Sequence, residues 1–126
     1  MKINYFTIGA FSATLAIALG AFGAHGLEGK ITEHYIQVFE TGVRYHMYSS
    51  LGLMLIGLLS KIVANNKSFI NGAHFILAGT IIFSGSLYIL SLTSFSKLGM
   101  ITPIGGVAMI IGWCMVAISA GKQKFN

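Results

Sequence analysis

The sequence has 126 residues, of which 55% are hydrophobic and only 9% are charged, and its formal net charge at pH 7 is +5. About a quarter of the residues in a soluble domain are charged. The eight basic and three acidic side chains cannot cover the surface of a soluble globule of this size. These numbers exclude a soluble enzyme, a disordered tail and a nucleic-acid-binding module. They indicate a single membrane domain over residues 1–126.

Four apolar runs of about 20 residues, long enough to span a bilayer as helices, follow one another along the chain. They cover residues 5–24, 45–63, 72–92 and 100–120. None has an aspartate, glutamate or arginine in its middle. Because lipid offers no hydrogen-bond partners to a backbone, each run is predicted to be helical.

The connection between the first and second runs holds all three acidic residues, Glu28, Glu33 and Glu40. Within it, residues 31–43 carry apolar side chains at helical spacing with polar ones mostly opposite. This pattern predicts an amphipathic helix lying in the headgroup plane, with Gly42 as the bend into the second span. The predicted fold is therefore an all-α, integral membrane four-helix bundle with an interfacial helix between spans 1 and 2.

The basic residues predict the orientation of the four spans. With four crossings, both termini lie on one side, together with the basic residues Lys2, Lys61, Lys67, Lys122 and Lys124. The opposite side has fewer basic residues, namely Lys30, Arg44 and Lys97. The positive-inside rule then predicts a multi-pass protein of the cell membrane with both termini in the cytoplasm.

Small residues recur along the predicted spans and favour close helix packing, which replaces the hydrophobic effect as the cause of helix association in lipid. The first span has a stripe at four-residue spacing, made of Ser12, Ala16, Gly20 and Ala24. The later spans add Gly85, Gly105, Gly106 and Gly112. The stripe can face its own bundle or a second copy, so a homo-oligomer stays open.

Ionisable residues near the membrane are candidates for function. Those at the junction of the first span, the surface helix and the second span are the candidate binding residues: His25, Arg44, Tyr45 and His46. The predicted topology places both histidines at the outer interface. No metalloenzyme spacing such as HExxH and no nucleophile elbow is present. We therefore expect no catalytic residue, no metal site, no cofactor and no enzyme activity.

Four ordered blocks of the sequence carry a family resemblance: Gly20–Leu27 (GAFGAHGL), Phe39–Leu51 (FETGVRYHMYSSL), Phe83–Tyr88 (FSGSLY) and Thr102–Gly106 (TPIGG), the last followed by Trp113. Together they resemble the small membrane family named domain of unknown function 423, which includes transmembrane protein 256. One departure is that family members often have glutamine and then histidine where this chain has His46 and Ser49. The resemblance implies four spans and no assigned activity, because the family has none established.

Three functions remain open from the sequence. The leading hypothesis is a structural or interaction bundle whose main partner is the lipid bilayer, because mid-membrane charge is absent while packing residues abound. The first alternative is a homo-oligomeric pore or small-solute transporter lined by the glycine-broken segments. The second is binding of a metal or a lipid headgroup at the outer interface. No nucleic-acid partner is expected.

Overall fold

The structure is a computed structural model that describes residues 3–63 and 66–122. Lys2 and Lys124, which contributed to the predicted orientation, lie outside the described residues. The elements in chain order are α1 (Tyr5–Gly26), α2 (Glu33–Leu59), α3 (Lys67–Thr93), the short 3-10 helix η1 (Ser96–Met100) and α4 (Thr102–Gly121). No strand occurs in the part of the chain that is described. The all-α prediction is therefore confirmed for these residues.

Side-chain caps explain where three of the helices begin. Asn4, Thr32 and Asn66 each accept a hydrogen bond, at 3.1 to 3.3 Å, from a backbone N–H in the first turn of α1, α2 and α3 respectively. Such caps satisfy N–H groups that have no partner within the helix. In α4 the first turn holds Pro103, which needs no N–H partner. Helix α3 ends at Thr93, and the left-handed backbone of the following Ser94 (φ 59°) closes the last turn.

A single helix, α2, replaces the two segments predicted over residues 31–43 and 45–63. Its charged side chains, Glu33, Glu40 and Arg44, are all exposed. They break the apolar pattern of the sequence, but the helical backbone continues past them because none of these charges has to be buried. The helix also continues through Gly42, where a Cβ would lie 2.9 Å from a ring carbon of Tyr88. Gly42 therefore allows α3 to pack closely and does not act as a bend. The prediction of a separate interfacial helix is corrected accordingly.

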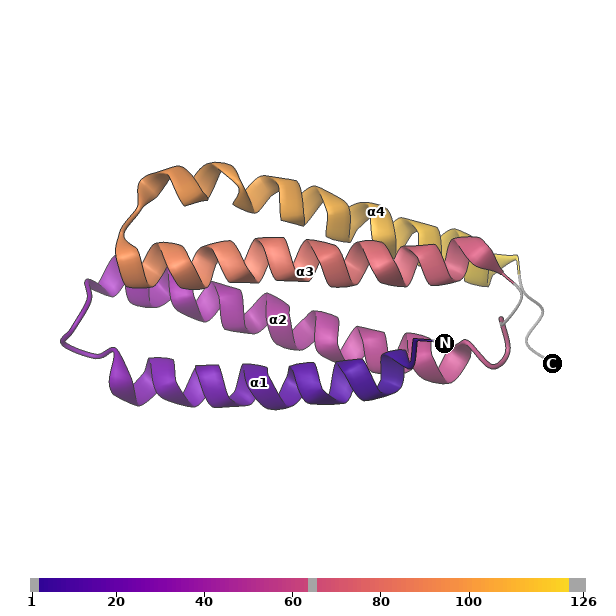
Figure 1. Ribbon diagram of the computed structural model, residues 1–126, viewed down its shortest axis with the longest axis horizontal. Helices are drawn as coiled ribbons and strands as arrows, with labels where there is room; N and C mark the ends of the chain where they lie inside the picture. The colour runs from indigo at the N-terminus through magenta and orange to yellow at the C-terminus, as the bar shows by residue number, and fades with distance from the viewer. Residues whose placement is uncertain (1–2, 64–65, 123–126) are drawn as a thin grey trace.

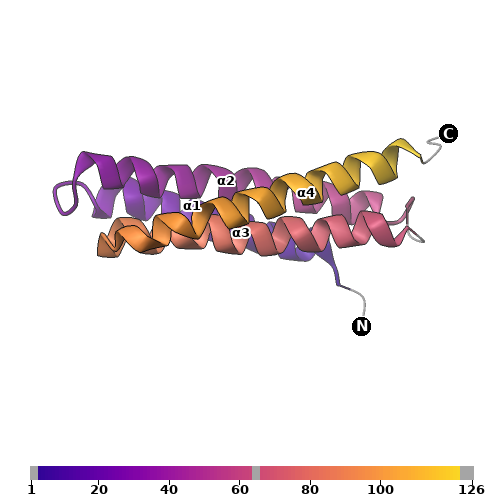
Figure 2. The ribbon, with the colours of Figure 1, turned by 90° about the horizontal axis from the view of Figure 1, so that it is seen from above.

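The helices follow one another in space as they do in the chain (Figure 1). Helix α1 packs against α2, α2 against α3, and α3 against α4, with each neighbour running the opposite way. Seen from above, all four lie along the same long axis (Figure 2). The start of α1 and the end of α4 lie at the same end of the molecule. Trp113 of α4 also reaches α2, where its ring lies over Gly52.

Helices α3 and α4 are held together by two glycine pairs. A Cβ on Gly79 would lie 2.7 Å from the carbonyl oxygen of Gly105, and the reverse distance is also 2.7 Å. About two turns away, a Cβ on Gly72 would lie 2.8 Å from the carbonyl oxygen of Gly112, with a reverse distance of 2.6 Å. Real side chains do not tolerate such distances. The two backbones therefore touch directly, as small residues permit in membrane helices.

The apolar surface is distributed as expected for helices in lipid. A buried cluster lies toward the end where α1 begins and includes Tyr5, Leu53, Ile56, Phe69 and Ile76. Large apolar side chains nevertheless remain exposed along the helices. Three segments are long and apolar enough to cross a membrane: Tyr5–Gly26, Lys67–Thr93 and Ser96–Gly121. The predicted spans 5–24, 72–92 and 100–120 fall within them, whereas α2 does not meet this criterion by composition.

Candidate functional site

His46 is the middle residue of α2, about 20 Å from either end of the helix. Its side chain is only 7% exposed and turns toward α1 and α3. The sequence placed it at the outer interface because the second span was expected to begin at Tyr45. The structure differs in the start of the helix: α2 begins at Glu33, so His46 does not open it.

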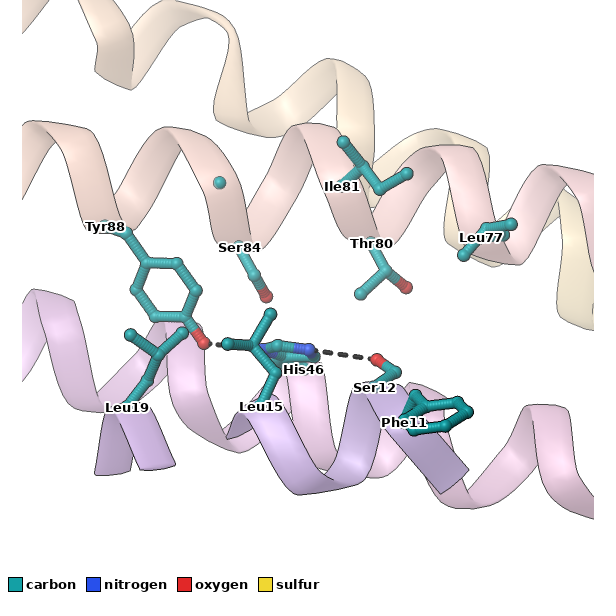
Figure 3. A pocket seen from close by; sticks show the side chains of 11 residues that line it. Phe11, Ser12, Leu15, Leu19, His46, Leu77, Thr80, Ile81, Ser84 and Tyr88 are labelled. Atoms are coloured by element: carbon teal, nitrogen blue, oxygen red, sulfur yellow. Dashed lines mark hydrogen bonds between the residues drawn. The ribbon is translucent and has the colours of Figure 1, made fainter. Parts of the chain in front are cut away.

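Two hydrogen bonds connect the His46 ring to two other helices (Figure 3). Nδ1 lies 2.8 Å from the hydroxyl oxygen of Tyr88 on α3. Nε2 lies 2.9 Å from Oγ of Ser12 on α1. A neutral imidazole donates from one nitrogen and accepts at the other, so both contacts suit an uncharged ring. One buried side chain thus ties three helices together.

Ser50, one turn after His46 on α2, extends this network. Its hydroxyl lies 2.7 Å from the carbonyl oxygen of His46 and 2.6 Å from Oγ of Ser12. A serine hydroxyl has one proton, so Ser50 donates to one of these two acceptors at a time. We refer to Ser12, His46, Ser50 and Tyr88 as the His46 network.

A groove of about 420 Å³ lies between α1 and α3, with His46 of α2 at its base. Almost all of the surface that its walls expose is apolar. Its rim is formed by the exposed side chains of Phe11, Leu15 and Ile81. The groove is therefore an apolar recess with polar atoms at the bottom, open on the side between α1 and α3.

Two further hydroxyls, those of Thr80 and Ser84, line the groove from α3 (Figure 3). Thr80 donates its proton to the carbonyl oxygen of Ile76, at 2.7 Å. Ser84 donates its proton to the carbonyl oxygen of Gly42, at 2.8 Å. Both hydroxyls have used their only proton, so they offer the groove acceptor lone pairs and no donor.

The other predicted binding residues lie away from this groove. Consecutive residues of a helix point about 100° apart, so Arg44, Tyr45 and His46 face different directions. Arg44 is exposed and borders a smaller hollow with Glu40. Tyr45 is exposed and packs edge-on against aromatic neighbours, and His25 is exposed in the last turn of α1. The groove and the hydrogen bonds of His46 include none of the other three.

The small residues predicted at helix contacts lie in different surroundings. Some are buried, or would bring an added Cβ within 3.4 Å of a neighbouring helix: Ala16, Gly20, Gly105 and Gly112. The others are Ser12 in the His46 network, Ala24 on the exposed surface, Gly85 beside the groove, and Gly106, where an added Cβ would lie 3.6 Å from Phe83. The sequence did not single out Tyr88, or the contact glycines Gly9, Gly57 and Gly72. Tyr88 lies in one of the blocks that carry the family resemblance, which was the only signal for it.

No group of three histidine, cysteine, aspartate or glutamate side chains in residues 3–63 and 66–122 is arranged to hold a metal ion. Cys114, the single cysteine, is exposed on α4.

The family described as "Protein of unknown function (DUF423)" matches residues 19–106. The UPF0382 membrane protein YwdK of Bacillus subtilis is 52% identical over 122 residues, which are 97% of this chain and 98% of that protein. A UPF0382 membrane protein of Staphylococcus aureus is 49% identical over the same shares of both chains. One of Staphylococcus epidermidis is 47% identical over 123 residues, again 97% and 98% of the two chains. No solved structure matches the chain. The chain therefore belongs to the DUF423 (UPF0382) family of membrane proteins, whose molecular function is not established.

Proposed function

We propose that all four helices cross the cell membrane, including α2, which is not among the three segments that are long and apolar enough by composition. The support is that α2 packs along both α1 and α3. Its contacts run along most of α1, from Phe39 over Gly23 to Ser50 and Met54 beside Gly9. A helix in contact with two apolar neighbours over such a length shares their depth in the bilayer.

In this arrangement both termini face the cytoplasm, as the basic residues favour. The start of α1, the end of α2, the start of α3 and the end of α4 share one end of the molecule. That end has the described basic residues Lys61, Lys67 and Lys122. The exposed acidic residue Glu28 belongs to the opposite end, in the connection from α1 to α2.

The function that the geometry supports best is binding of a lipid-soluble ligand that enters the groove sideways from the bilayer. The carrying observation is the His46 network at the base of a carbon-lined groove that opens between α1 and α3. Ligand sites are typically apolar recesses with a few convergent polar groups. Ionisable residues at mid-membrane depth are costly to keep and mark functional sites by default.

We propose binding without catalysis. Ser12 and His46 have the spacing of a nucleophile and its base, but Ser12 lies inside α1. The N–H groups around it are therefore bonded within the helix, and they are not free to stabilise an oxyanion. A carbon-lined groove also suits a lipid-soluble molecule better than a hydrated solute, so it favours binding over a pore. The structural role, a homo-oligomer and headgroup or metal binding near His25 and Arg44 stay predictions.

Photolabelling in lipid nanodiscs tests the proposal. An uncharged alkyl diazirine is expected to label the groove residues Leu15, Leu77 and Ile81 more strongly than Ile110, an exposed residue of α4. Gly85→Leu fills the groove, because no atom lies within 4 Å of the Cβ position. This variant should abolish the stronger labelling of the groove residues relative to Ile110. Gly121→Leu, at an equally open position, is the matched control. Equal labelling of the groove and Ile110, or an excess that survives Gly85→Leu, would contradict the proposal.

A further inference from the structure

The tautomer of His46 decides whether every proton of the His46 network is used in a hydrogen bond within the protein. The Ser12 hydroxyl, the neutral His46 ring and the Tyr88 hydroxyl each have one proton to donate. Only two hydrogen bonds join these three groups. Whichever tautomer the ring adopts, the proton of either Ser12 or Tyr88 is therefore not used between these three groups, and both residues line the groove.

The two cases differ in what can accept the remaining proton. When it belongs to Ser12, the nearby Oγ of Ser50 is available, because Ser50 can donate instead to the His46 carbonyl. When it belongs to Tyr88, no hydrogen bond found among the described residues takes it. In that second case Ser50 donates to Ser12, Ser12 to Nε2, and Nδ1–H to Tyr88. The chain of hydrogen bonds then ends at the hydroxyl proton of Tyr88, a residue that lines the groove.

The position of the groove limits what can accept this proton. His46 lies at the midpoint of α2, about 20 Å from either end. Phospholipid ester and headgroup oxygens lie near the membrane surface, so they do not reach this depth. A charged group at the bilayer centre is strongly disfavoured. The acceptor therefore belongs to an uncharged molecule that dissolves wholly in the hydrocarbon layer.

We propose that the groove binds an uncharged, lipid-soluble carbonyl compound whose oxygen accepts a hydrogen bond from Tyr88. This inference rests on the proposed function and names the ligand class. A carbonyl supplies an acceptor and brings no proton of its own, which matches the tautomer in which the Tyr88 proton has no acceptor among the described residues. Ligand binding selects the tautomer in which Nδ1–H of His46 donates to Tyr88. The rest of the ligand packs against the apolar walls, such as Leu15 and Ile81.

Competition against the diazirine label tests the ligand class with three uncharged rings that differ at one carbon: cyclododecanone, cyclododecanol and cyclododecane. They are compared at equal mole fractions in the lipid of the nanodisc. The ketone is expected to compete about tenfold better than the hydrocarbon, which is the ratio that one hydrogen bond supplies. Tyr88→Phe should bring that ratio close to one. Tyr48→Phe, which alters an exposed tyrosine of α2, should leave the ratio unchanged.

A second variant keeps the test decisive if Tyr88→Phe does not fold. In Ser12→Ala the ring can still donate to Tyr88, and Tyr88 can still donate to the ligand, so the ketone preference should persist. Loss of the preference in Ser12→Ala, or its persistence in folded Tyr88→Phe, would overturn the role of Tyr88. Equal competition by ketone and hydrocarbon, or stronger competition by the alcohol, would overturn the carbonyl class and leave groove binding intact. If none of the three rings competes, ligand binding in the groove fails as well.

Discussion

Nδ1 of His46 lies 2.8 Å from the hydroxyl oxygen of Tyr88, although 42 positions separate the two residues in the chain. In the low-dielectric interior of a membrane protein, an unpartnered polar group costs several kcal/mol. The bond to Tyr88 and the bond to Ser12 together remove that cost for the imidazole. His46 therefore stabilises the packing of three helices and also supplies the polar base of the groove.

Replacement of His46 by alanine should destabilise the fold. The variant removes both hydrogen bonds and leaves Ser12 and Tyr88 to find other partners. We expect the free energy of unfolding to fall by about 1–3 kcal/mol, measured by denaturant titration in mild detergent. His25→Ala is the control, because His25 is exposed at the end of α1, and it should change stability by less than about 0.5 kcal/mol. Equal effects of the two substitutions would contradict the structural role of His46.

The glycine pairs between α3 and α4 predict a sharp contrast between neighbouring positions. Gly105→Ala places a methyl group 2.7 Å from the Gly79 carbonyl oxygen, so the helices must separate. Overpacking of this kind costs about 1–3 kcal/mol. Gly106→Ala meets its nearest atom, in Phe83, at 3.6 Å and should be neutral or slightly stabilising. The free energy of unfolding in detergent is measured for both variants. A Gly105→Ala protein as stable as the unsubstituted protein would show that the two backbones do not touch.

Gly85→Leu should block the groove without harming the fold. Glycine in a helix interior costs about 0.5–1 kcal/mol relative to better helix formers, and the new side chain meets no atom within 4 Å of its Cβ. The free energy of unfolding should therefore stay the same or rise, while labelling of the groove is lost. A large loss of stability would mean that the space beside Gly85 is already filled by protein.

Cysteine accessibility tests the four crossings. In a Cys114→Ser background, single cysteines replace Glu28, Ser96, Ile62 or Gly121, all of which are exposed near helix ends. A membrane-impermeant maleimide added to intact cells should label positions 28 and 96. Positions 62 and 121 should react only after the membrane is opened. Labelling of 28 and 62 from the same side would show that α2 does not cross.

Helices α1, α3 and α4 were predictable from the sequence, because a helix that contacts lipid needs a long run of apolar residues. The predicted spans accordingly fall within α1, α3 and the segment Ser96–Gly121. Helix α2 was divided in two because its exposed charges, Glu33, Glu40 and Arg44, resemble those of a surface helix. Continuity of the helix is supplied by packing against α1 and α3, which a reading of local composition does not detect.

The candidate site was predicted only in part for a related reason. The sequence singled out His46, but together with its chain neighbours Arg44 and Tyr45, which helical geometry turns to other faces. Its hydrogen-bond partners, Ser12 on α1 and Tyr88 on α3, lie 34 and 42 positions away in the chain. No local spacing encodes such a meeting, which depends on how α1 and α3 align with α2.

A high-resolution experimental structure of the protein in nanodiscs of its native lipids tests ligand binding most directly. We predict density between α1 and α3, bordered by Leu15 and Ile81, with a polar atom within hydrogen-bond distance of the Tyr88 hydroxyl. Helices α1 and α3 packed directly against each other, with no space above His46, would contradict a binding groove.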